Sequence, residues 1–122
     1  MTLLVRPSNG YLTHDTNYFT SMDPYCYLYL GKQAQKTAPH YGGGIRPQWK
    51  EVMKFSIDNI AKLGIEIWTK AMIGNDTLIG QGMVDLNKLH LSKGTPIQGI
   101  YVFMPEYVDV FFSNKPAGRI LL

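Results

Sequence analysis

The sequence has one cysteine and no long apolar run. With a single cysteine among 122 residues, an internal disulfide is excluded, and a lack of disulfides is typical of reducing compartments. No apolar stretch approaches the ~20 residues that a helix needs to cross a bilayer. The first residues also lack the apolar core of a signal peptide. We therefore expect a cytoplasmic protein, whose contact with a membrane or the cytoskeleton is peripheral.

Known catalytic and metal-binding patterns are also missing. The histidines are His14, His40 and His90, and none forms a metal-spaced pair with another histidine or with Cys26. Cys26 lies on the apolar side of an alternating run, so we interpret it as a buried small hydrophobe rather than a nucleophile. The glycine triplet at 42–44 lacks the Gly-Lys-Ser/Thr that completes a phosphate-binding loop. The sequence therefore predicts a protein that is not an enzyme and needs no cofactor.

The net charge is small and positive. Twelve Lys and Arg against nine Asp and Glu give a net charge of +3. This surplus suits an anionic membrane or an acidic protein, but it is too small to indicate nucleic acid. The length and the absence of linkers and repeats predict one domain over residues 1–122, large enough to form a core without disulfides.

Hydrophobic side chains alternate with a period of two, which predicts strands. The alternating or strand-like runs are 2–5, 25–30, 53–58, 63–68, 107–112 and 119–122. Turn-forming residues separate these runs at 7–10, 42–44, 46–47, 74–76 and 115–118. About eight short strands with such turns predict an all-β fold, an eight-stranded antiparallel β-sandwich. The one helical pattern is short and lies near 85–92, with Asp85 as its cap.

The order of several motifs resembles the C2 domain family. The motifs are Asp23-Pro24-Tyr25 before a strand, Lys36-Thr37 at the end of the next, Pro47, Trp49 and Glu51 before an F-x-I strand, Trp68 at the end of an apolar strand, and Ile79-Gly80. The resemblance covers essentially the whole chain and implies a Greek-key sandwich of eight antiparallel strands. The runs at 2–5 and 119–122 imply the variant of that fold in which the terminal strands are adjacent.

Members of this family often hold calcium between loops at one end, mainly with aspartates, because calcium takes six to eight oxygen ligands. The resemblance places Asp23 in the first loop. Asp15 is its candidate partner, since Asn17 occupies the usual position, and Asp76 lies near the end of the third loop. Asp15, Asp23 and Asp76 are therefore the candidate calcium ligands.

Other positions of the third loop depart from the calcium pattern of the family. Where the family has aspartates, this chain has Thr69 and Ala71, with Lys70 between them. Three carboxylates beside a lysine offer few negative oxygens to a divalent ion. We therefore predict a degenerate site without functional calcium, in which Asp23 and Pro24 form a structural turn.

Two surfaces are candidates for membrane contact. The loop candidates are Tyr18, Phe19 and Met22 in the first loop and Met72 and Ile73 in the third. The basic candidates are Lys32, Lys36, Lys50 and Lys54, for which the resemblance implies a concave face that attracts acidic phosphoinositides. Two alternatives stay open. Phe19 or Met22 plugs the end of the sandwich, and the lysines form an ordinary solvated face.

Tyrosines form the candidate protein-binding surface. Tyr25, Tyr27 and Tyr29 share one face of a strand, and tyrosine is enriched in interface hot spots. The alternative is that the neighbouring segment 101–107 covers them. That segment ends a long apolar connection, 95–107, and connections of this length are usually functional or docked on another surface. We predict a calcium-independent adaptor that binds protein partners in a larger assembly. The alternative function is a peripheral module that binds anionic phospholipid, with weak assistance from calcium.

Overall fold

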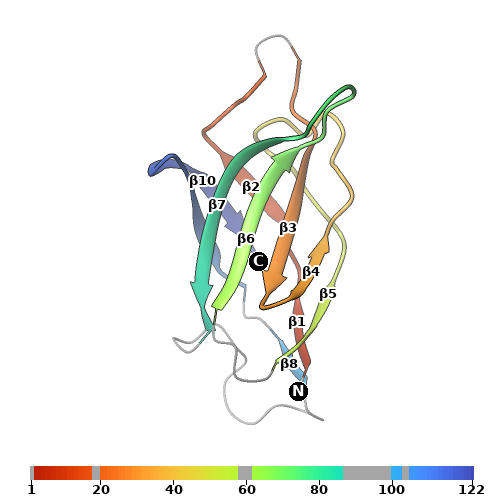
Figure 1. Ribbon diagram of the computed structural model, residues 1–122, viewed down its shortest axis with the longest axis vertical. Helices are drawn as coiled ribbons and strands as arrows, with labels where there is room; N and C mark the ends of the chain where they lie inside the picture. The colour runs from red at the N-terminus through yellow and green to blue at the C-terminus, as the bar shows by residue number, and fades with distance from the viewer. Residues whose placement is uncertain (1, 18–19, 58–61, 87–99, 103–104) are drawn as a thin grey trace.

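The structure is a computed structural model, and it describes residues 2–17, 20–57, 62–86, 100–102 and 105–122 (Figure 1). The strands are β1 (Thr2–Val5), β2 (Asn9–Leu12), β3 (Pro24–Leu30), β4 (Gln33–Lys36), β5 (Met53–Ser56), β6 (Lys62–Thr69), β7 (Thr77–Asp85), β8 (Ile100–Val102), β9 (Tyr107–Phe112) and β10 (Lys115–Leu121). The predicted all-β fold is confirmed, but the described residues contain ten strands rather than eight. No helix in this part of the chain has the length and hydrophobicity to cross a membrane.

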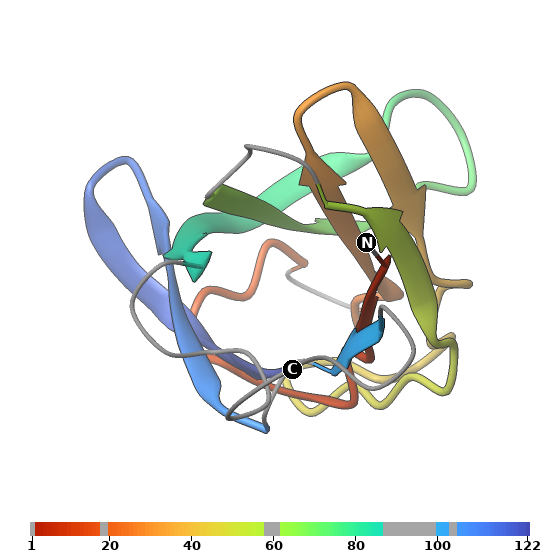
Figure 2. The same cartoon turned by 90° about the horizontal axis from the view of Figure 1, so that it is seen from below.

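The strands form two sheets that enclose the core. The larger sheet has the order β2-β10-β9-β7-β6-β3-β4, and the smaller has the order β5-β1-β8. Neighbouring strands are antiparallel except β1 and β8, which run parallel. Figure 2 shows that the larger sheet curls around the core while the smaller sheet closes the remaining side. The outer face of the larger sheet is therefore the most extensive surface on which strand side chains can form a binding site.

The predicted strand at 2–5 is β1, and a second strand, β2, begins at Asn9 within the predicted turn at 7–10. β1 pairs with β5 and β8, whereas β2 pairs with β10. The proline between β1 and β2 has no backbone N–H to continue a ladder, so it separates the two pairings. The prediction that the first and last runs are adjacent is therefore wrong for residues 2–5. β2, and not β1, is the neighbour of the C-terminal strand β10. Just before β2 begins, the N–H of Ser8 donates to the carbonyl of Leu121 at 2.9 Å.

Alternation places apolar side chains in the core as the sequence predicts. In β3 the inward-facing Cys26, Leu28 and Leu30 are fully buried, and burial raises the pKa of the Cys26 thiol. Full burial of one leucine contributes about 1.5–3 kcal/mol. Trp49 joins this core, and its Nε1 donates to the carbonyl of Pro24 at 3.0 Å. The cysteine therefore has the packing position predicted for it.

Two local predictions are wrong. Asp85, the predicted helix cap, is instead the last residue of β7 and pairs with Lys62, and residues 87–92 lie outside the described residues. Residues 115–118 belong to β10 rather than to a turn. The turn before β10 is formed by Ser113 and Asn114, which both have positive φ. Such a pair matches the twist of a tight hairpin.

Candidate functional site

The loop between β6 and β7, residues 70–76, projects from one end of the larger sheet (Figure 1). Met72 and Ile73 stand in this loop with 98% and 94% of their surface exposed. Gly74 has a φ of 84°, a left-handed conformation that lets the chain turn back toward β7. Two consecutive apolar side chains without cover are unfavourable in water, so their exposure indicates a contact surface.

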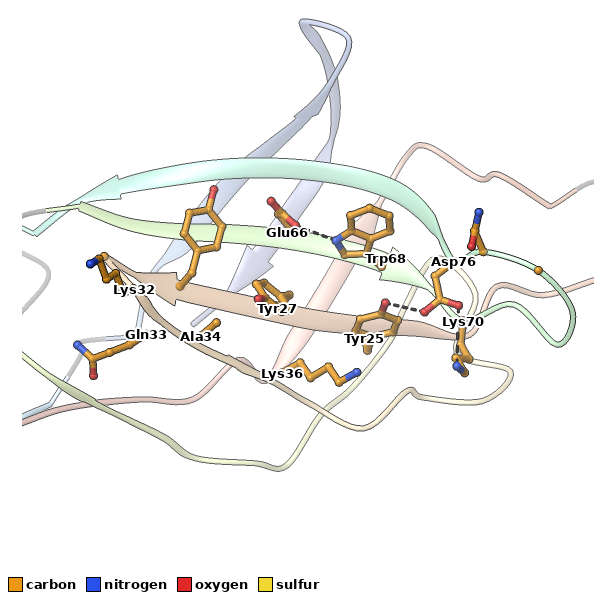
Figure 3. Close-up of a pocket in the computed structure, with 14 residues that line it drawn as sticks. Tyr25, Tyr27, Lys32, Gln33, Ala34, Lys36, Glu66, Trp68, Lys70 and Asp76 are labelled. Carbon is orange, nitrogen blue, oxygen red and sulfur yellow. Dashed lines mark hydrogen bonds and ion pairs between the residues drawn. The ribbon is translucent and has the colours of Figure 1, made fainter.

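Asp76 fixes the base of this loop. Its Oδ1 accepts a hydrogen bond from the N–H of Ala71 at 2.8 Å, and its Oδ2 accepts one from the Tyr25 hydroxyl at 2.7 Å (Figure 3). Lys70 Nζ lies 4.0 Å from Asp76 Oδ1. The Ala71 N–H, the Tyr25 hydroxyl and Lys70 lower the pKa of Asp76 against the opposing effect of burial. Burial, and then Asp76, raises the pKa of Tyr25.

The other two candidate calcium ligands are engaged separately. Asp23 Oδ1 accepts a hydrogen bond from the N–H of Gly42 at 2.8 Å, and Asp15 Oδ1 accepts one from the N–H of Asn17 at 3.0 Å. Within the described ranges, no group of three or more His, Cys, Asp or Glu side chains is placed to hold a metal ion. Each carboxylate thus bonds to its own neighbours instead of converging with the others. These residues fit a calcium ion poorly.

Thr69 forms structural hydrogen bonds where the family resemblance implies a calcium ligand. Its Oγ1 accepts a bond from the N–H of Asp23 at 2.9 Å, and the N–H of Lys70 donates to the carbonyl of Asp23 at 3.0 Å. Thr69 also pairs with Pro24 across the sheet. These bonds join the end of β6 to the start of β3 through neutral groups. They accord with the structural turn expected at Asp23 and Pro24.

The first loop contributes less to an exposed tip than predicted. Met22 is completely buried, and the N–H of Thr16 donates to its Sδ at 3.4 Å. Its prediction as a membrane-contact residue is therefore wrong, and the alternative that it plugs the end of the sandwich holds. A flexible thioether fills such an irregular gap well and is more stable there than in water. Tyr18 and Phe19 lie outside the described residues.

An open groove of about 1020 Å³ lies along the outer face of β3, β4 and β6 (Figure 3). Its aromatic and basic lining residues are Tyr25, Tyr27, Tyr29, Trp68, Lys32, Lys36 and Lys70. Glu66 and Asp76 add two carboxylates to this tyrosine groove. Residues 105–107 are not among the lining residues of this groove, and Pro105 borders a separate groove. The side chains of the rest of the 95–107 connection lie outside the described residues.

Close packing fixes the tyrosine rings in the groove. The ring of Tyr29 lies directly over Gly64, where a Cβ would come within 2.0 Å of Tyr29 Cζ. The Tyr27 and Tyr29 rings lie 6.2 Å apart, and Lys36 Nζ lies 5.6 Å from the Tyr25 centroid in a cation–π contact. Burial raises the pKa of Tyr29. The Tyr29 hydroxyl therefore stays protonated near neutral pH and can donate a hydrogen bond to a ligand.

The four candidate lysines do not form one face. Lys32 and Lys36 line the tyrosine groove, whereas Lys54 lies on β5 in the smaller sheet and Lys50 precedes that strand. The Gln33 side chain on β4 donates to and accepts from the backbone of β5 at 2.7 Å, which joins the two sheet edges. The prediction of a single four-lysine face is therefore wrong. Two of the four lysines belong to the groove.

Sequence reasoning missed Glu66, Trp68 and Lys70 as groove residues. Trp68 Nε1 donates to Glu66 Oε1 at 2.9 Å, which orients the indole along the groove. Glu66 and Trp68 alternate with the buried Ile67, and this alternation was a signal that the side chains of Glu66 and Trp68 face outward. Their place beside the tyrosines depends on the pairing of Trp68 with Tyr25, and such a register cannot be read from one strand alone.

The chain is similar to known proteins in sequence and in structure. A curated relative, elicitor-responsive protein 3 of Oryza sativa subsp. japonica, is 29% identical over 83 residues, which cover 67% of this chain and 58% of the relative. The match thus spans less than two thirds of the relative's length. The solved structure of a C2 domain-containing protein has a TM-score of 0.74 at 23% identity, and the match covers 99% of this chain and 84% of that one.

A further solved structure has the same fold. A C2 domain of plant extended synaptotagmin 1 has a TM-score of 0.73 at 14% identity, covering 94% of this chain and 85% of that one. The family model described as the C2 domain matches residues 5–102. This segment contains the tyrosine groove and the loop with the exposed tip. The chain therefore belongs to the C2 domain family.

Proposed function

We propose that this chain is a calcium-independent module that docks on anionic membranes through the loop between β6 and β7. C2 domains act as modules that bind calcium and lipid or bind proteins. The observation that carries the proposal is the near-complete exposure of Met72 and Ile73. Apolar side chains of this size gain about 1.5–3 kcal/mol each on full burial, and the boundary between headgroups and acyl chains offers such burial.

Lysines beside the exposed tip support a preference for anionic lipid. Lys70 begins the loop, and Lys32 and Lys36 line the tyrosine groove that continues from the loop base. A lysine close to an anionic leaflet contributes about 1 kcal/mol, and this attraction weakens as salt is added. The tyrosine hydroxyls of the groove add neutral donors that suit phosphate oxygens. The loop and the groove thus form a continuous surface for a lipid headgroup layer.

The base of the loop supports calcium independence. In a calcium-dependent site the ion offsets the repulsion between carboxylates. In this chain the Ala71 N–H, the Tyr25 hydroxyl and Lys70 offset the charge of Asp76. The loop is therefore held in shape before any ligand arrives. We extend the proposal to a peripheral, non-catalytic role in the cytoplasm that needs no cofactor.

Vesicle flotation tests the proposed function. The protein is mixed in chelator with phosphatidylcholine vesicles that either contain or lack phosphatidylserine, and the vesicles are floated through a density gradient. We expect the protein to float with the anionic vesicles in chelator alone. Protein that stays at the bottom with both vesicle types would overturn membrane docking. Flotation that requires added calcium would overturn calcium independence.

A second candidate function, protein docking, has support from the tyrosine groove. The groove combines three tyrosines, a tryptophan and charges of both signs, a composition typical of protein interfaces. On this proposal the chain is an adaptor in a larger assembly. Proteins crosslinked to the wild-type chain in cells should be lost with Tyr27→Ala. Equal recovery with both chains would count against this function.

A further inference from the structure

A second cluster of aromatic and basic side chains lies on the outer face of β2, β10 and β9. Arg119 is flanked by two rings, with its Cζ 4.5 Å from the centroid of Tyr107 and 5.3 Å from that of Tyr11. Arg46 Cζ lies 5.4 Å from the Tyr11 centroid. The two tyrosine rings meet edge to face with their centroids 5.8 Å apart. Tyr11, Tyr107, Arg46 and Arg119 are named here the arginine–tyrosine cluster.

Strand register brings the cluster together. Arg119 on β10 pairs with Tyr11 on β2 and with Asp109 on β9. Tyr107, two residues before Asp109, faces the same side of β9. Arg46 comes from the segment that hydrogen-bonds along the outer edge of β2. The cluster shares no lining residue with the tyrosine groove, from which β7 separates it in the sheet order. It is a separate surface.

Both guanidinium groups are held in place and keep donors for a partner. Arg46 Nη1 donates to the carbonyls of Ile45 at 2.9 Å and Leu12 at 3.5 Å. The other nitrogens of the Arg46 guanidinium take no part in these two bonds. The structure shows no hydrogen bond or ion pair between the Arg119 guanidinium and any other described residue. Stacking on a ring restrains a guanidinium while its edge N–H groups stay available. The donors are therefore preorganised, and less side-chain entropy is lost when they bind.

The surface around the cluster combines charge with exposed aromatic area. A pocket of about 310 Å³ is lined by Tyr11, Arg46, Arg119 and Asp109. On β9 the rings of Tyr107 and Phe111 flank Asp109 on the same side, and they are 45% and 43% exposed. Two guanidinium groups thus face a small pocket with one carboxylate, beside uncovered rings. This arrangement suits a ligand that carries negative charge next to an apolar side chain.

We propose that the arginine–tyrosine cluster binds an acidic segment of another protein. The guanidinium forks hold a carboxylate of the partner, and an apolar side chain of the partner packs against Phe111. Arginine and tyrosine are enriched in interface hot spots, and the arginine fork matches carboxylate geometry. Asp109 within the surface disfavours a uniformly anionic membrane. A second copy of the chain is a poor partner, because its net charge is +3 and its nine acidic residues are never adjacent in sequence.

Selection of peptides from a random display library on the full chain tests the proposal. Enriched peptides are synthesised, and their dissociation constants are measured by fluorescence anisotropy. We expect enrichment of Asp and Glu beside an apolar residue. Arg119→Gln should weaken the selected peptide by about tenfold or more. Arg119→Lys should weaken it by less, because lysine keeps the charge and loses the fork. Lys54→Gln, which removes the same charge elsewhere, should change little.

Several results would overturn the proposal. Enriched peptides that lack acidic residues, or that bind Arg119→Gln as tightly as the wild-type chain, would contradict it. Equal losses with Arg119→Gln and Lys54→Gln would mean that net charge alone attracts the peptides. A loss of flotation on anionic vesicles with Arg119→Gln would assign the cluster to a membrane instead. If Arg119→Gln does not melt like the wild-type chain, Arg46→Gln replaces it in each comparison.

Discussion

Replacing Met72 and Ile73 by serine isolates the apolar part of membrane docking. Both side chains are almost fully exposed, so the double variant loses no buried surface and should keep the stability of the wild-type chain. Complete burial of the two side chains would contribute about 3–6 kcal/mol. Insertion to the acyl boundary that buries roughly half of their surface corresponds to about 1.5–3 kcal/mol, or to a change of about 10- to 150-fold in affinity.

Sedimentation with vesicles that contain phosphatidylserine, in chelator and over a range of lipid concentrations, measures this change. Val52→Ser is the matched control, because Val52 is an exposed apolar residue that borders a different groove with Leu4 and Leu121. We expect the control to partition like the wild-type chain and the double variant to need about 10 to 150 times more lipid. Equal partitioning of the double variant and the wild-type chain would refute the argument from exposure.

Three further variants test the groove and the loop base. Lys32→Gln with Lys36→Gln should weaken binding to anionic vesicles by up to about 30-fold at low salt, and Lys54→Gln on the smaller sheet should weaken it less when sedimentation is repeated. Because folding lowers the pKa of Asp76, its contribution to stability is present at neutral pH and is lost as the pH falls below about 4. Asp76→Asn should therefore destabilise the chain to urea at neutral pH and flatten the loss in acid, whereas an unchanged acid profile would contradict this role. Gly64→Ala should displace the ring above it and lower the free energy of unfolding by about 1–3 kcal/mol, and unchanged urea unfolding would contradict that packing.

Local alternation was sufficient to predict the core and the outer face of single strands. Leu28 lies inside and Tyr27 lies outside, because successive side chains of a strand point to opposite faces. The family was predicted from the order of short motifs and is confirmed by the match over residues 5–102. Both inferences use chemistry that is contained within short stretches of the chain.

Features that depend on pairing between distant segments could not be predicted. Met22 belongs to a loop by its pattern, yet it is fully buried and is part of the core cluster just before β3 begins. Lys36 and Lys54 belong to strands of different sheets, which their sequence spacing does not reveal. Trp68 reaches the groove only through its pairing with Tyr25. Register and sheet order are set by the whole core and not by any one strand.

A spin label in place of Ile73 tests the central claim most directly. Cys26 is fully buried and burial raises its thiol pKa, so a cysteine introduced by Ile73→Cys is labelled selectively. With anionic vesicles in chelator, the account predicts that dissolved oxygen, which concentrates in lipid, relaxes the label more than a water-soluble nickel complex does. Added calcium should change neither the relaxation of the label by oxygen nor its relaxation by the nickel complex. A label that stays accessible to the nickel complex, or that enters lipid only after calcium is added, would contradict the account.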